Sequence, residues 1–205
     1  MSLTDAITVQ PAGEARFHAH VDEQWTALQG VNGGIVAALA VAAVEHVLRD
    51  AGVDPATTLR AATFGYVSGN SVGDLTIDVE VIRRGRAMIT THVRTEQGDK
   101  TTTLARLHHS TPWVGPEYSD APPMPTRPAG TVRLQAPPAH VNHLETHLHP
   151  DTTLFAGTAR AEWIAWSPSA IPAVSSRTVG SGRGPCCATA ASSVGPGTNA
   201  VAIQG

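Results

Sequence analysis

No stretch of the sequence carries a long run of lysine or arginine, and its 205 residues have a formal net charge of −3. A nucleic-acid partner needs a basic patch that neutralises phosphates, so the composition gives such a partner no support. Cysteine is equally scarce, because Cys186 and Cys187 are the only two and they are adjacent. Neighbouring cysteines seldom pair with each other, and a zinc site needs more ligands at usable spacing. We therefore predict no oxidising compartment and no metal.

Apolar runs long enough to span a membrane are also missing. Residues 1–11 lack the basic start and the apolar stretch of a signal peptide. The one long apolar run, residues 35–44, is rich in alanine and only half as long as a membrane span. We predict a cytoplasmic protein without a membrane partner.

The N-terminal half contains a strand pattern, a turn and a helix pattern in that order. Residues 15–28 are broadly extended, with Phe17, Ala19 and Val21 alternating against polar side chains. A glycine-rich turn follows at residues 29–34. Residues 35–51 then form the clearest helix, which ends at Gly52 and is apolar around nearly its whole circumference. Such a helix is typical of a buried position.

Four strand-like runs follow this helix, at residues 59–68, 74–84, 87–96 and 101–110. The turns at residues 83–86 and 97–99 are short enough for hairpins, so the strands should pair antiparallel. A strand, a long buried helix and four antiparallel strands predict an α+β domain over residues 1–112. Its antiparallel sheet would wrap around the long central helix.

The composition changes in the second half. Eight prolines lie between residues 112 and 138, so residues 113–138 are predicted to be a proline-rich linker. Residues 139–166 alternate again and predict the opening strands of another domain. Residues 167–205 are rich in Ser, Gly, Ala and Pro and have too few large apolar residues to offset chain entropy. We predict disorder in this low-complexity tail.

Three segments together resemble a known family. They are the Gly-Val-Asn-Gly-Gly of residues 30–34 before the Ala/Val helix, residues 64–69 on the next strand, and residues 79–86 at the following hairpin. In their order and spacing they resemble the acyl-CoA thioesterase II-like (TesB-like) hot-dog family over residues 10–112. The resemblance implies a hot-dog fold, a role in fatty acid metabolism and an acyl-CoA substrate. It implies no cofactor, since coenzyme A belongs to the substrate.

Members of this family usually carry two hot-dog domains in one chain. Residues 139–166 resemble the first strands of the second domain, which would then be incomplete. We hypothesise a truncation, such as a shifted reading frame, near Trp166 or Ser167, which sequencing of the coding DNA would test. In thioesterase II-like proteins the catalytic Asp, Thr and Gln belong to the second domain, so none is carried over here. A single hot-dog domain exposes its sheet edge, which favours a homodimer or a higher homo-oligomer.

The glycine-rich turn is the predicted catalytic site. Asn32, Gly33 and Gly34 precede a helix whose free N–H groups and positive dipole end favour a developing oxyanion. The alternative is a tight turn into a packed helix. Glu45 is the one acid on the helix that could reach inward, yet an exposed position beside Arg49 is the favoured interpretation.

The predicted substrate-binding residues belong to a strand end and a hairpin. They are Tyr66, Ser68, Asn70, Arg83, Arg84 and Arg86. Guanidinium groups bind phosphate in a bidentate manner, so the arginines are candidates for the phosphates of coenzyme A. A solvated turn is the alternative for the arginines, and core or turn roles are the alternative for the other three.

Four histidines invite a metal site but do not make a convincing one. They are His140, His143, His147 and His149. The last three would share one strand face with Glu145, and no other acid or cysteine partner has suitable spacing. A half-buried or surface strand is the favoured interpretation.

We thus predict an acyl-CoA thioesterase that hydrolyses acyl-CoA to free fatty acid and coenzyme A. The alternative is a catalytically impaired, truncated scaffold that binds acyl-CoA or only dimerises. A hot-dog hydratase or dehydratase needs a paired histidine and acid in its groove. His46 directly follows Glu45 and therefore points elsewhere on the helix.

Overall fold

The computed structural model describes residues 2–113, 115, 126–135, 139–143, 146–151, 162–167 and 199–204, the last two segments as backbone only. The chain divides into two compact units. The first is Met1–Gly115 with Pro137–His143, and the second is Pro116–Ala136 with Leu144–Gly205. Each unit is described by itself.

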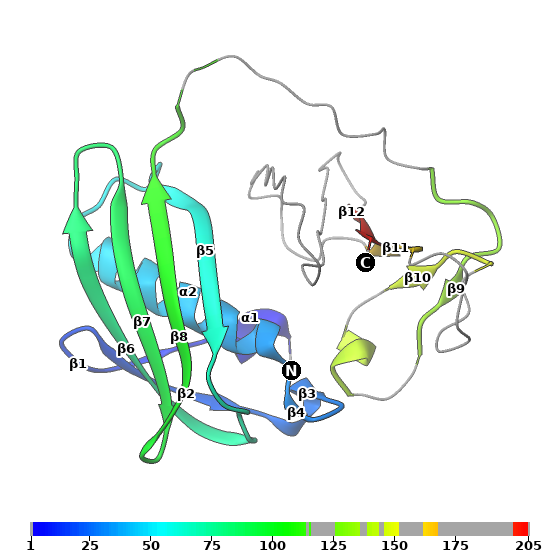
Figure 1. Ribbon diagram of the computed structural model, residues 1–205, viewed down its shortest axis with the longest axis horizontal. Helices are drawn as coiled ribbons and strands as arrows, with labels where there is room; N and C mark the ends of the chain where they lie inside the picture. The colour runs from blue at the N-terminus through cyan, green and yellow to red at the C-terminus, as the bar shows by residue number, and fades with distance from the viewer. Residues whose placement is uncertain are drawn as a thin grey trace. The chain divides into compact units, whose positions relative to one another are not determined.

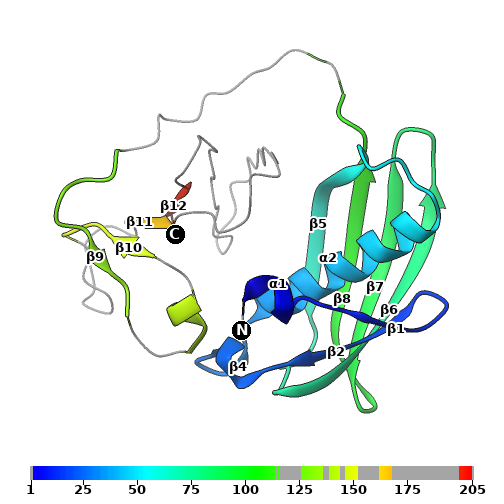
Figure 2. The same ribbon diagram turned by 180° about the vertical axis from the view of Figure 1, so that it is seen from behind.

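The first unit is one antiparallel sheet curved around one long helix, α2 (Gly33–Asp50), as Figures 1 and 2 show. The sheet has six strands in the order β1-β2-β6-β7-β8-β5. Their bounds are β1 (Gln10–Gly13), β2 (Arg16–Val21), β5 (Thr58–Tyr66), β6 (Gly73–Arg84), β7 (Ile89–Gln97) and β8 (Lys100–Ser110). The predicted α+β fold with a sheet around a central helix is confirmed.

The core lies between α2 and the sheet face that it crosses. Val36, Leu39, Ala40, Ala43 and Val44 of the helix are completely buried. Alternate residues of the strands meet them, and the buried pattern of β2 has the period of two that its sequence predicts. Small side chains on the helix let the sheet approach closely.

Only one face of α2 is buried, whereas the sequence predicted burial all round. Ala37, Ala38, Val41 and Ala42 on the other face are only partly covered. The physical reason is that a single sheet covers only one side of a helix.

The N-terminal strand is shorter than predicted. β2 stops at Val21 because the Asp22 side chain accepts a hydrogen bond from the Gln24 N–H at 2.9 Å and caps the 3-10 turn η1 (Glu23–Trp25). A small hairpin of β3 (Thr26–Ala27) and β4 (Gly30–Val31) then leads to α2. The first fifteen residues hold a helical turn, α1 (Leu3–Ala6), and the edge strand β1, neither of which was predicted.

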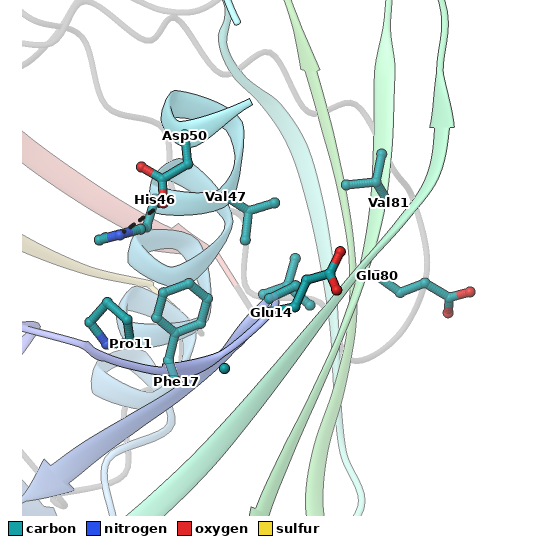
Figure 3. Close-up of a pocket in the computed structure, with 11 residues that line it drawn as sticks. Pro11, Glu14, Phe17, His46, Val47, Asp50, Glu80 and Val81 are labelled. Atoms are coloured by element: carbon teal, nitrogen blue, oxygen red, sulfur yellow. Dashed lines mark ion pairs between the residues drawn. The ribbon is translucent and has the colours of Figure 1, made fainter. Parts of the chain in front are cut away.

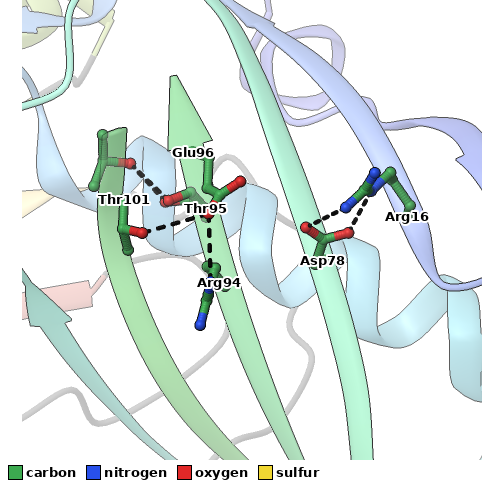
Figure 4. Close-up of polar contacts among 7 residues, drawn as sticks. Arg16, Asp78, Arg94, Thr95, Glu96 and Thr101 are labelled. Carbon is green, nitrogen blue, oxygen red and sulfur yellow. Dashed lines mark hydrogen bonds and ion pairs between the residues drawn. The ribbon is translucent and has the colours of Figure 1, made fainter. Parts of the chain in front are cut away.

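Polar side chains also fix the register between strands (Figure 4). Arg16 on β2 and Asp78 on β6 are register partners and form two hydrogen bonds, of 2.6 and 3.0 Å. Between β7 and β8, the Thr95 and Thr102 hydroxyls lie 2.8 Å apart in a buried position. These contacts stabilise the antiparallel alignment that the hairpins begin.

The described part of the second unit is a four-stranded antiparallel sheet in the order β12-β11-β10-β9. Its strands are β9 (Val132–Arg133), β10 (His147–Leu148), β11 (Glu162–Ser167) and β12 (Asn199–Gln204). β9 lies within the predicted linker. The rest of the tail predicted to be disordered, apart from Ser167 and β12, lies outside the described residues. The partial second hot-dog domain stays a prediction.

The histidine segment differs from its prediction. Residues 139–143 form a 3-10 helix, η2 (Ala139–His143), and belong to the first unit, whereas β10 begins only at His147. His143 and His147 therefore do not share a strand face. Within the described residues, no group of three or more His, Cys, Asp and Glu side chains is arranged to hold a metal ion.

Among the helices of the described residues, none has the length and apolar character needed to cross a membrane.

Candidate functional site

The N-terminus of α2 presents a backbone donor that no described residue accepts from. The Asn32 side chain caps the helix, and its Oδ1 accepts from the Gly34 N–H at 2.7 Å. The Ile35 N–H donates to the Asn32 carbonyl at 3.2 Å. The Gly33 N–H, at the first helical position, has no acceptor among the described residues. This donor lies at the positive end of an 18-residue helix.

Tyr66 lies directly against this helix start. Its hydroxyl donates to the Gly33 carbonyl at 2.8 Å. A side-chain carbon on Gly33 would lie only 2.9 Å from Cζ of Tyr66, so the close approach requires glycine at this position. Partial burial raises the pKa of Tyr66, which keeps its phenol protonated as a donor. The Tyr66 side chain remains 52% exposed, so the helix start is open to solvent.

Asn70 holds the turn that precedes the helix. Its carbonyl accepts from the Val31 N–H at 3.1 Å. Gly30 has a φ of +115°, and a side-chain carbon there would lie 2.9 Å from the same carbonyl oxygen. Asn70 is 7% exposed, and its Oδ1 has no partner in the described part of the chain. The structure thus brings Tyr66 and Asn70 together with the predicted Asn32–Gly34 turn.

Ser68 has a different place. Its hydroxyl donates to the Thr101 carbonyl at 2.9 Å, so it fastens the end of β5 to the start of β8. This is the turn role that the sequence left open as the alternative.

Glu45 lies away from the helix start. It is exposed, as the favoured alternative predicted. The helix rises about 1.5 Å per residue, so Glu45 lies roughly 18 Å along the axis from Gly33. The other acid of α2, Asp50, is exposed at its last turn. No acid of α2 therefore reaches the Gly33 N–H at the start of the same helix.

The arginine hairpin lies at the opposite end of α2. Arg83, Arg84 and Arg86 are exposed at the turn between β6 and β7. The Arg84 side chain donates to the Ala51 carbonyl at 3.2 Å and so binds the C-terminal end of the helix. Within one domain the arginines and the Asn32–Gly34 turn are not brought together. Their contact with phosphate stays a prediction.

A pocket of about 590 Å³ lies between the β1–β2 hairpin, the C-terminal half of α2 and β6 (Figure 3). Its apolar wall includes Phe17 and Val79, and His46 and Asp50 form an ion pair of 3.3 Å beside it. The lining carries the carboxylates of Glu14 and Asp50 but no lysine or arginine, and the Glu80 side chain points away from the pocket (Figure 3). Negative charge repels phosphate, so this pocket does not suit the nucleotide end of coenzyme A.

Trp25 is the residue of this region that the sequence did not single out. Its carbonyl accepts from the Asn32 N–H at 2.8 Å, and its side chain is 6% exposed. The available signal was Asp22, since an Asp followed by a break in the strand alternation is typical of a capped turn. That signal places a turn but does not connect Trp25 with the helix start.

The fold and the turn that begins α2 identify a structural class, and the family follows from a separate comparison. Solved structures with the same arrangement include a hot-dog protein of unknown function from Alicyclobacillus acidocaldarius, with a TM-score of 0.66 at 20% identity over 80% of this chain and 61% of that one. A putative thioesterase II from Thermobifida fusca has a TM-score of 0.65 at 19% identity, over 80% and 62% of the two chains. The fold is therefore a hot-dog fold, as predicted.

The family comparison agrees with the resemblance in the sequence. Residues 21–109 match the family model described as the acyl-CoA thioesterase N-terminal domain. An acyl-CoA thioesterase II, TesB2, from Mycobacterium marinum has a TM-score of 0.61 at 17% identity, covering 81% of this chain and 59% of that one. The predicted likeness to TesB-like thioesterase II proteins is confirmed for this domain.

The chain spans about three fifths of the length of these solved structures. No curated protein matches the sequence.

Proposed function

We propose that the hot-dog domain hydrolyses acyl-CoA thioesters to free fatty acid and coenzyme A at the N-terminus of α2. The observation that carries this proposal is the Gly33 N–H, which has no acceptor among the described residues and lies at the positive end of a long helix. A thioester carbonyl oxygen that accepts from this donor is stabilised as negative charge develops on it.

The reaction needs few parts. Water adds to the carbonyl carbon, the tetrahedral intermediate collapses, and the carbon–sulfur bond breaks. The hydroxyl stays on the acyl carbon, and the proton that water loses is returned to the departing thiolate. The turn supplies the oxyanion contact, while the Tyr66–Gly33 hydrogen bond of 2.8 Å keeps the backbone at this point in place.

Neither acid of α2 is placed to act as the general base at the start of this helix, because both lie in its C-terminal half and are exposed. We infer that a second copy of the chain supplies it across a homodimer. The partly covered face of α2, with Ala37, Ala38, Val41 and Ala42, and the strand β5 at the sheet edge support such a contact. A cytoplasmic location and a role in fatty acid metabolism belong to the same proposal.

Two substitutions at Asn32 test the proposed site. Asp and Ser cap helices about as well as Asn, so both variants should keep the thermal stability of the protein. Asn32→Asp places a carboxylate beside the Gly33 N–H, where it repels an oxyanion. We expect it to lower kcat about a hundredfold, which is typical for loss of one oxyanion donor. The neutral Asn32→Ser variant should keep most of the activity.

The assay follows release of the coenzyme A thiol from acyl-CoAs of several chain lengths. Equal activity of the two variants would mean that the reaction does not take place at the N-terminus of α2. If a folded protein hydrolyses none of these substrates, the proposed thioesterase activity is rejected. The second candidate, a scaffold that binds acyl-CoA without turnover, would then be tested by calorimetric titration with an acyl-CoA. The placement of both α2 acids favours this candidate.

A further inference from the structure

A short segment that follows the proline-rich stretch packs on the turn that begins α2. The imidazole of His143, in η2, stacks on the indole of Trp25, with ring centroids 4.7 Å apart and ring planes 22° from parallel. Trp25 is 6% exposed. A stacked aromatic contact of this kind covers apolar surface and also restricts the orientation of both rings.

A hydrogen bond supports the same contact one turn earlier. Nδ1 of His140 lies 2.8 Å from the Thr26 carbonyl oxygen. A carbonyl only accepts, so His140 carries its proton on Nδ1. Thr26 pairs with Val31 across the β3–β4 hairpin, whose last residue immediately precedes the helix cap.

Backbone hydrogen bonds connect both contacts to the start of α2. The Trp25 carbonyl accepts from the Asn32 N–H at 2.8 Å, and the Val31 N–H donates to the Asn70 carbonyl at 3.1 Å. The residue that stacks on His143 therefore also holds the residue that caps α2. Two histidines more than one hundred positions away in sequence act on the backbone that sets the direction of the Gly33 N–H.

We propose that Ala139–His143 is a clasp that positions the N-terminus of α2, and that His143 and His140 are positioning residues for the hydrolytic site. The proposal rests on the proposed function. The clasp touches no substrate atom; it acts through Trp25 and Thr26 on Asn32 and Gly33. In this arrangement the segment Pro137–His143 completes the N-terminal domain before the chain returns to the second unit.

The clasp predicts a specific pattern of kinetic change. Loss of the stack lets the hairpin shift while the helix and sheet stay folded. A small displacement of an oxyanion donor weakens the transition state more than substrate binding. We expect His143→Ala to lower kcat roughly tenfold with KM little changed, and His140→Ala to have a smaller effect in the same direction. His143→Phe keeps a flat ring and should restore most of the loss.

The experiment uses the full chain with Trp113, Trp163 and Trp166 replaced by Phe, so that emission reports on Trp25 alone. His143→Ala should shift this emission to longer wavelength, because the indole becomes exposed, and His143→Phe should return it. His18→Ala, at an exposed position of β2, is the control and should change neither kcat nor emission. Circular dichroism checks that each variant is folded.

Two results would overturn the clasp. Unchanged Trp25 emission in His143→Ala would mean that the stack is absent in solution. A shifted emission with unchanged kcat would mean that the stack does not position the site.

If the unsubstituted protein hydrolyses no acyl-CoA, the proposed function is rejected but the clasp is not. Amide hydrogen exchange then tests the clasp: the hydrogen-bonded amides of Asn32 and Ile35 should exchange faster in His143→Ala than in His143→Phe. Equal rates would reject the clasp as well.

Discussion

At the residue scale, Gly33 is the most constrained position of the candidate site. Its carbonyl accepts from Tyr66, its N–H has no acceptor among the described residues, and the Tyr66 ring leaves no room for a side chain. Glycine is needed here for the close approach and not for an unusual φ. At the adjacent Gly34 a side-chain carbon would instead lie 2.8 Å from the Asn32 Oδ1 that caps the helix.

Gly33→Ala is expected to lower the free energy of unfolding by about 1–3 kcal/mol, because the new carbon collides with the Tyr66 ring. Gly69→Ala is the matched control, since a side-chain carbon there meets nothing within 4 Å. Urea unfolding measures both. In a chain that already carries Tyr66→Ala, the cost of Gly33→Ala should shrink. An equal cost in both chains would contradict the collision.

His109 on β8 is a second constrained residue, buried in the core at 1% exposure. Neither of its ring nitrogens has a hydrogen-bond partner among the described residues. Burial, together with the nearby His108, lowers the pKa of His109. The folded protein therefore holds the imidazole in its neutral form.

The lowered pKa predicts a loss of stability in acid. Between the ordinary pKa of about 6.5 and the lowered folded value, the unfolded chain binds a proton that the folded chain does not. Stability from this group is full above about pH 6.5 and falls as the pH drops through the folded pKa. His109→Leu should flatten the dependence of the unfolding free energy on pH below about pH 6.5, the ordinary pKa of histidine. Leu107→Ile, at a buried position of the same strand without a titratable group, should leave this pH dependence unchanged.

At the scale of elements, α2 is predictable from sequence, and its surroundings are less so. The alternation of apolar residues gives the strands and the Ala/Val run gives the helix, because both patterns are local. The capped turn at Asp22 and the edge strand β1 escape prediction. The turn depends on the Asp22 side chain, which competes with the hydrogen bonds between strands. β1 depends on β2, the neighbouring strand with which this short segment pairs.

The three arginines of the β6–β7 hairpin were predicted to share one role, phosphate binding, but Arg84 also contacts the end of α2. Arg84→Ala removes the hydrogen bond to the Ala51 carbonyl, so we expect the unfolding free energy to fall by about 0.5 kcal/mol. Arg83→Ala and Arg86→Ala should leave stability unchanged and, if they bind phosphate, raise KM for acyl-CoA. Thermal unfolding and steady-state kinetics distinguish these roles. Unchanged KM in both variants would remove the arginines from the substrate site.

At the scale of the whole molecule, the sheet edge at β5 is the surface to test for assembly. β5 pairs only with β8 within the described residues, and the middle of the strand is exposed. In a two-fold pair the central residues of two such strands meet, so Ala62→Lys brings like charges together. Light scattering should show half the mass of the unsubstituted protein. Ala12→Lys, on the opposite edge strand β1, should keep the dimer mass.

The sequence by itself determined the order of the long helix and the strands that follow it, the buried face of β2 and the place of the helix start. Those features follow from periodicity and from glycine and cap chemistry that act over a few residues. Only the tertiary structure decided which predicted site residues meet. It joined Tyr66 and Asn70 to the Asn32–Gly34 turn and separated Glu45 and the arginines from it. It also brought His143 onto Trp25, because contacts between distant residues depend on the path of the whole chain.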